Sequence, residues 1–251
     1  MNPKQLIKGL LLLGGYELTR AGNAAQPFHS WDYLRHTGRR LEHLASLNIP
    51  VFQKSVLEVG AGIGDHSHYY LDRGCRMTIT EARHESIAYL RARYPEAEIK
   101  HLDMDNPDER LDEKFDVVHC YGLLYHLKNP AAAIAYLAAR NTFLFFLETC
   151  VSFGAGLREN FVAEKQQDPT QSITGTGCRP TREWVFAELH KHFEHVYCTC
   201  TQPNHPEFPV DWTRPDLHHA PFSRAVFVGS RRPLQMPTLI DYLPAVQSRH
   251  A

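Results

Sequence analysis

The stretch Leu57-Glu58-Val59-Gly60-Ala61-Gly62-Ile63-Gly64-Asp65 decides the fold of this chain. Residues 55–59 are a short apolar, β-branched run, which is typical of a parallel strand covered on both faces. The glycines that follow allow a tight turn and let backbone N–H groups approach a ligand closely. Their G-x-G-x-G spacing differs from the G-x-G-x-x-G of a pyrophosphate-binding turn. We therefore predict a strand, a turn suited to a nucleoside without phosphates, and a helix, with Glu58 placed to receive an ammonium group.

Acidic residues follow the next two predicted strands. Residues 76–80 form the second strand and lead to Glu81, which follows the glycine turn by about 20 residues, the usual spacing of a ribose-binding acid. The third strand, 99–102, ends at Asp103 and Met104, where a carboxylate suits an adenine amino group and a thioether packs on the ring. A fourth strand, 115–120, runs into residues 121–126. Because the carboxyl ends of parallel strands border one crevice, these residues predict a single binding site.

These elements, in this order and spacing, resemble the class I S-adenosylmethionine-dependent methyltransferases. The resemblance rests on residues 57–65, Glu81, Asp103-Met104 and residues 115–126. It implies an α/β fold, a doubly wound, Rossmann-like sheet of seven strands whose last strand is antiparallel. Strands five to seven are then expected at 142–147, 193–197 and 224–228. The implied cofactor is S-adenosyl-L-methionine, with contacts from Glu58, Gly60, Ala61, Gly62, Glu81, Ala82, Asp103, Met104, Cys120 and Tyr121.

Length and composition favour one cytoplasmic α/β enzyme domain. The 251 residues are 43% hydrophobic and 22% charged, as in an ordinary globular domain that buries a sizeable core. The net charge of −1 and the absence of long Lys/Arg runs argue against a broad nucleic-acid-binding surface. The apolar run at 10–13 stops at Gly14-Gly15 and is too short to span a membrane. We expect no membrane partner.

Two helices, 3–13 and 31–47, are predicted ahead of the glycine turn. In the second helix Leu34, Leu41, Leu44 and Leu47 recur at helical spacing. The resemblance implies that such helices cover the substrate side, so we divide the chain into a helical cap, 1–50, and a methyltransferase domain, 51–251. The remaining positions of the second helix are interpreted as a solvated face, with a cationic cap over the substrate entrance as the alternative, and they hold Arg35, His36, Arg39, Arg40 and His43.

Two long irregular segments, near 150–180 and 201–222, are assigned to substrate recognition. Such loops inside a compact domain are commonly functional, and five prolines restrict the second one. His205 and Trp212 are its candidate substrate contacts. Arg179 and Arg182 flank Pro180 at a predicted helix start, where they suit an anionic substrate or ordinary surface pairing.

Methyl transfer from a sulfonium is an in-line displacement that depends mainly on orientation, although an oxygen or nitrogen nucleophile needs its proton removed. His126, just after strand four, is the candidate base, the alternative being a structural histidine that bonds a loop carbonyl. Tyr125 is placed to hold the nucleophile or the sulfonium in line. Glu148 is a candidate second base or substrate anchor, or else a loop-ordering carboxylate.

The six cysteines lack the C-x-x-C pairs of a zinc site, so we predict packing thiols and no metal. The alternative is a metal site formed by Cys198-x-Cys200 with His205 nearby.

The predicted function is O- or N-methylation of a small molecule. The runner-up is modification of a tRNA nucleoside, because residues 122–126, Asn129-Pro130 and 147–149 are similar to the enzymes that carboxymethylate a wobble uridine with a carboxylated cofactor. Those enzymes are longer and more basic. Residues 177–182 and 202–205 instead resemble uncharacterised bacterial methyltransferases. A non-catalytic nucleoside-binding module is the third hypothesis.

Overall fold

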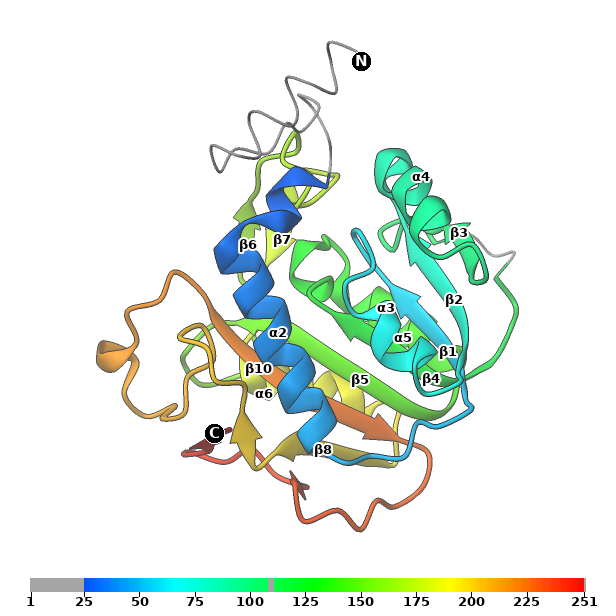
Figure 1. Cartoon of the computed structure of the whole chain (residues 1–251). Helices are drawn as coiled ribbons and strands as arrows, with labels where there is room; N and C mark the ends of the chain where they lie inside the picture. The colour runs from blue at the N-terminus through cyan, green and yellow to red at the C-terminus, as the bar shows by residue number, and fades with distance from the viewer. Residues whose placement is uncertain (1–24, 108–110, 251) are drawn as a thin grey trace, which may run out of the picture.

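An eight-stranded sheet runs through the computed structural model, which describes residues 25–107 and 111–250 (Figure 1). Its strand order is β11-β8-β10-β5-β4-β1-β2-β3. Strands β1 to β5 pair with one another in parallel, as expected for a doubly wound sheet. The strands are β1 (Ser55–Val59), β2 (Arg76–Glu81), β3 (Glu98–His101), β4 (Phe115–Tyr121), β5 (Asn141–Val151), β8 (His195–Thr199), β10 (Ser223–Ser230) and β11 (Leu239–Ile240).

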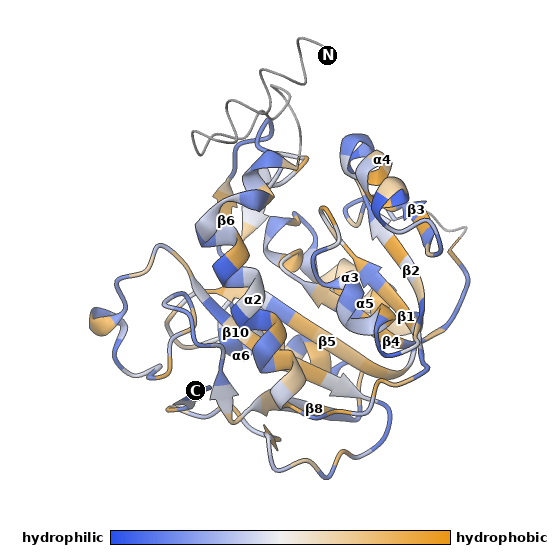
Figure 2. Ribbon diagram, viewed as in Figure 1, coloured by the Kyte–Doolittle hydropathy of each residue, from blue (hydrophilic) through white to orange (hydrophobic). Residues whose placement is uncertain are grey.

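Helices cover both faces of this sheet. One face is covered by α2 (Trp31–Ser46), α3 (Ser67–Leu71) and α4 (His84–Arg93). These helices contribute Leu44, Tyr70 and Leu90 to the hydrophobic cluster on that face. Leu137 and Leu189 pack in the cluster on the other face, under α5 (Pro130–Ala139) and α6 (Arg182–His190). Successive strand residues alternate between the two clusters because side chains point to opposite faces of a sheet. Hydrophobic residues accordingly concentrate in the central strands (Figure 2).

The strand order confirms the predicted fold class, with one addition at the edge. β10 lies between β5 and β8 and is antiparallel to both, as the resemblance implied for strand seven. The predicted seven strands become eight because the late residues Leu239–Ile240 pair with β8. Strand β5 also continues to Val151, beyond the predicted end at 147, because β10 pairs with it over that length.

The long segments contain small structures that the sequence did not indicate. Segment 150–180 holds a two-stranded sheet, β6 (Phe161–Ala163) with β7 (Thr176–Cys178). Segment 201–222 holds β9 (Thr201–Gln202), which pairs with β12 (Ser248–Arg249). Short 3-10 helices lie at η1 (Gln26–His29), η2 (Leu124–His126) and η3 (Pro215–Leu217).

The predicted helix 31–47 is confirmed as α2, whose first turn is capped by the Ser30 hydroxyl accepting from the Tyr33 N–H at 3.3 Å. The helix predicted at 3–13 lies outside the described residues. The interpretation of a solvated polar face holds for Arg35, which is exposed, and Arg39 is partly exposed. It is wrong for His36, Arg40 and His43, which are buried, whereas Trp31 is 78% exposed.

The six cysteines are unpaired, and Cys200 alone among them is not fully buried. No helix in the described part of the chain is long and apolar enough to cross a membrane.

Candidate active site

A cavity of about 1680 Å³ opens at the carboxyl ends of β1, β2 and β4. The predicted cofactor contacts line it, from Glu58 and the glycine turn to Met104 and Tyr121, with the exception of Cys120. The Cys120 side chain lies in the hydrophobic cluster under α5 and α6, and burial raises the pKa of its thiol to about 12. Because alternate strand residues point to opposite faces, Cys120 is turned away from the cavity while Tyr121 lines it.

The glycine turn needs its glycines for both conformation and space. Gly60 and Gly62 have φ values of 63° and 59°, where a side chain is strained. A Cβ on Gly60 would lie 2.8 Å from Leu123 Cδ1, and one on Gly62 would lie 3.0 Å from Phe28 Cε1. The turn is therefore enclosed between the residues after β4 and those of η1.

Glu81, at the end of β2, ties this turn to the second strand. Its carboxylate accepts from the backbone N–H groups of Gly62 at 2.8 Å, Ala82 at 2.8 Å and Arg83 at 3.0 Å. Burial raises the pKa of Glu81, and these hydrogen bonds oppose the shift. Two carboxylate oxygens offer about four acceptor sites, so Glu81 retains capacity for a ribose hydroxyl in addition to its anchoring role.

Glu58 lies beneath the same turn. Its carboxylate accepts from the Ser67 hydroxyl at 2.5 Å, and burial raises its pKa to about 7. A cation arriving at this carboxylate would favour the ionised form, which suits the predicted contact with an ammonium group.

Segment 150–180 lines the cavity between Ala163 and Ile173 and is fastened to the end of β2. The Arg83 guanidinium donates to the carbonyl oxygens of Gln166, Asp168 and Gln171 at 3.2, 3.0 and 2.9 Å. Because Arg83 lies two residues after the Glu81 anchor, this segment is attached to the strand end that carries the predicted ribose contact.

His126 and Glu164 form a dyad on the cavity wall. His126 Nδ1 lies 2.5 Å from Glu164 Oε2, and Arg179 donates to Glu164 Oε1 at 3.0 Å. Although burial acts to raise it, the hydrogen bonds from His126, Ser172 and Arg179 bring the pKa of Glu164 down to about 2. An ionised carboxylate can only accept, so Nδ1 carries the proton. Burial also holds the pKa of His126 below its usual value.

This dyad leaves His126 as a neutral imidazole with Nε2 as its acceptor. Among the described residues Nε2 has no hydrogen-bond partner, and the side chain is 14% exposed on the wall of the cavity. The alternative of a structural histidine bonded to a loop carbonyl is not what the structure has. Glu164 was not predicted from the sequence as a site residue, because it lies in an irregular segment without a periodic pattern.

Tyr125 joins a second, buried network. The Arg224 guanidinium donates to the Tyr125 hydroxyl at 3.1 Å and to Glu148 Oε1 at 3.1 Å. Arg40 of α2 donates to Glu148 Oε2 at 3.1 Å. Glu148 is fully buried between these two arginines and does not line the cavity. This position corrects the expectation of a second base, since an acceptor cannot reach the carboxylate directly.

Two of the four candidate substrate contacts line the cavity, and two do not. Arg179 and His205 are on its wall. Arg182 instead donates to the Pro244 carbonyl at 3.0 Å and stacks on Trp212, with the guanidinium 4.0 Å from the ring centroid. Trp212 in turn donates to Gln247 at 2.8 Å. This pair fastens the C-terminal residues to α6 and holds both side chains away from the cavity.

Comparison with solved structures shows the same fold in other proteins. The N-terminal domain of EvdMO1, crystallised with SAH bound, has a TM-score of 0.58 at 19% identity, covering 92% of this chain and 98% of that domain. The Burkholderia thailandensis 1,6-didemethyltoxoflavin-N1-methyltransferase has 0.54 at 17%, covering 93% and 92%. The magnesium protoporphyrin IX methyltransferase of Synechocystis PCC 6803, with bound SAM, has 0.53 at 12%, covering 92% and 98%.

The sheet order and the crevice beside its glycine turn are those of the class I S-adenosylmethionine-dependent methyltransferase fold. Within the chain, residues 56–141 match the methyltransferase domain family. No curated protein matches the chain in sequence.

Proposed function

We propose that this enzyme methylates an oxygen or nitrogen atom of a small molecule, with His126 as the general base. The observation that carries the proposal is the dyad, in which an ionised Glu164 fixes the tautomer and leaves Nε2 of a neutral imidazole to accept a proton. A base of this kind is required when the nucleophile is a hydroxyl or a protonated amine.

The part of the cavity lined by Glu81, Asp103 and Met104, its nucleoside half, is assigned to the cofactor, S-adenosylmethionine. Glu81 and the glycine turn would hold the ribose and methionine parts, and Asp103 with Met104 would hold the adenine. Met104 is buried, so its thioether can pack on a ring, while backbone and side-chain donors from Asp105 and Asn106 fix the Asp103 carboxylate.

The acceptor would lie between the cap and the two long segments. The described part of the cap, η1 and α2, lines the cavity together with Arg179 and His205 of those segments. Known relatives in fold include enzymes named for toxoflavin and protoporphyrin substrates, which are small molecules. The cavity volume, about 1680 Å³, accommodates a cofactor and a small acceptor together.

The chemistry then divides between geometry and proton removal. The nucleophile's lone pair forms a bond to the methyl carbon as the carbon–sulfur bond breaks and its electrons remain on sulfur. The nucleophile's proton passes to His126 Nε2, and Glu164 stabilises the imidazolium that forms. Tyr125, held by Arg224, would orient the acceptor.

The test uses the purified protein, methyl-deuterated S-adenosylmethionine, and two separate pools of metabolites and tRNA. Mass spectrometry should find a labelled product among small molecules and none in tRNA nucleosides. His126→Ala is the control, expected to lose about 100-fold or more of the turnover while still binding cofactor. Label in tRNA alone would overturn the proposal in favour of the tRNA hypothesis, and label in neither pool would favour a binding module.

A further inference from the structure

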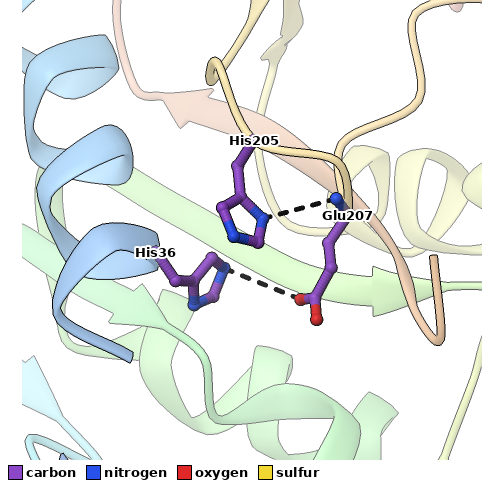
Figure 3. A group of neighbouring side chains, drawn as sticks. All are labelled: His36, His205 and Glu207. Atoms are coloured by element: carbon purple, nitrogen blue, oxygen red, sulfur yellow. Dashed lines mark hydrogen bonds and ion pairs between the residues drawn. The ribbon is translucent and has the colours of Figure 1, made fainter. Parts of the chain in front are cut away.

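Three side chains of types that can bind a metal meet on the wall of the cavity (Figure 3). His36 comes from α2, and His205 and Glu207 come from the segment after β9. One ligand atom from each lies within 4.8 Å of the other two. His205 was expected near Cys198 and Cys200, but the fold brings it beside His36 and Glu207.

His36 is buried without a hydrogen-bond partner for its Nε2 atom. That atom is aimed at the group, 3.8 Å from Glu207 Oε2. Leaving a buried polar atom unpaired costs about 1–3 kcal/mol, so this arrangement indicates a missing partner.

The other two ligands are positioned by their surroundings. Arg224 Nε donates to Glu207 Oε2 at 2.7 Å, which orients the carboxylate and leaves Oε1 available. The Glu207 N–H donates to His205 Nδ1 over a long 3.3 Å, so an ion that binds at Nε2 must displace the ring proton to Nδ1 and replace this weak hydrogen bond. A hydrogen-bond donor behind a ligating carboxylate, such as Arg224 here, is a regular feature of metal sites.

The chemical types of these three ligands restrict which metal ion can bind. Two imidazoles and one carboxylate suit Zn²⁺ and similar transition metals better than Mg²⁺ or Ca²⁺, which prefer oxygen ligands. Zinc–ligand bonds of about 2.1 Å place tetrahedral ligands about 3.4 Å apart, so the group must contract by about an ångström. Three protein ligands leave at least one coordination position for a bound molecule.

Charge indicates what takes that position. The two arginines of the neighbouring network, Arg40 and Arg224, are balanced by Glu148 and Glu207. These four side chains together carry no net charge. A divalent ion would add two positive charges, which an anionic oxygen donor would offset.

We propose that His36, His205 and Glu207 bind one divalent transition-metal ion of the zinc type, whose open position takes an oxygen donor of the acceptor. Binding of the ion does not depend on the proposed function, whereas the role of the acceptor rests on it. The ion would fix the acceptor's orientation from the side opposite the cofactor.

The test is calorimetric titration of the chelator-treated full chain with Zn²⁺. One saturable equivalent is expected, and His205→Ala should weaken it by about 10-fold or more. His205 is only partly buried, so this variant should fold, which retained binding of S-adenosylhomocysteine would confirm. His190→Ala, which changes an exposed histidine of α6, is the matched control and should bind as the unchanged chain does.

Replacing zinc by Co²⁺ tests the open position. Azide should change the visible spectrum of the bound Co²⁺, because a small anion occupies the free coordination position. Absence of a stoichiometric Zn²⁺ equivalent, or equal affinity in His205→Ala, would overturn the site. An unchanged Co²⁺ spectrum would overturn the open position. Loss of S-adenosylhomocysteine binding by the unchanged chain would count against the proposed function and leave the Zn²⁺ result standing.

Discussion

Replacing Glu164 by glutamine tests whether the carboxylate makes His126 a base. Glu164 Oε2 lies 2.5 Å from His126 Nδ1, and the imidazole gains a positive charge when it takes the acceptor's proton. A hydrogen bond to a charged group contributes about 1.5–3 kcal/mol. Losing it from the charged state lowers kcat by about 10- to 150-fold, since each 1.36 kcal/mol changes a rate tenfold.

The pH profile separates this role from a structural one. Turnover requires neutral His126, so kcat falls as pH drops through the pKa of His126, which burial holds below 6.5. The Glu164 carboxylate acts to raise that pKa, so Glu164→Gln should move the acid limb to lower pH while reducing the plateau. The assay is kcat against pH with the acceptor identified by deuterium labelling.

Glu113→Gln is the matched control, because this carboxylate pairs with Lys100 in solvent. Glu164→Asp keeps the charge and should retain more of the plateau. Glu164 also holds Arg179 and the Ser172 N–H, so thermal unfolding and cofactor affinity are measured on each variant. Turnover of Glu164→Gln within twofold of normal, or a lower plateau with an unmoved acid limb, would refute the reasoning.

Three other predictions concern the cofactor crevice and α2. Glu81→Ala should weaken S-adenosylmethionine binding by about 1–3 kcal/mol in calorimetry, because a buried hydrogen-bonding carboxylate is lost; unchanged affinity would contradict its assignment. Gly38→Ala should stabilise the protein by about 0.5–1 kcal/mol in urea unfolding, since a Cβ there meets nothing within 4 Å. Gly64→Ala should instead destabilise the protein, because its Cβ would lie 2.6 Å from Tyr94. Arg40→Met should cost about 3 kcal/mol in the same assay, and a neutral effect would show that the buried ion pair is dispensable.

The residues of the nucleoside crevice could be predicted from the sequence because short stretches at the ends of the strands determine them. A glycine turn after a buried strand, and acids after the next strands, reach one edge of a parallel sheet whatever the loops do. Glu58, Glu81 and Met104 accordingly line one cavity.

The acceptor side was less predictable because distant partners determine it. Hydrophobic spacing favoured Leu34 as a buried residue of α2, yet it is 47% exposed. Arg40 of the same helix is buried instead, because the Glu148 carboxylate, 108 residues away in the sequence, neutralises its charge. The spacing of residues in one helix does not predict a carboxylate on a different strand. For the same reason, the sequence around His126 did not predict its contact with Glu164.

The position of β10 affects the order in which this protein can be completed during synthesis. The strand is the link between β5 and the pair β8–β11, although residues 223–230 come after both β5 and β8 in the chain. While the ribosome is still adding residues before 223, β8 has no neighbour in the main sheet and β5 has an open edge. An exposed strand edge invites pairing with other chains. A nascent chain that stalls before residue 223 should therefore be the most aggregation-prone stage of synthesis, even though its nucleoside crevice is already encoded.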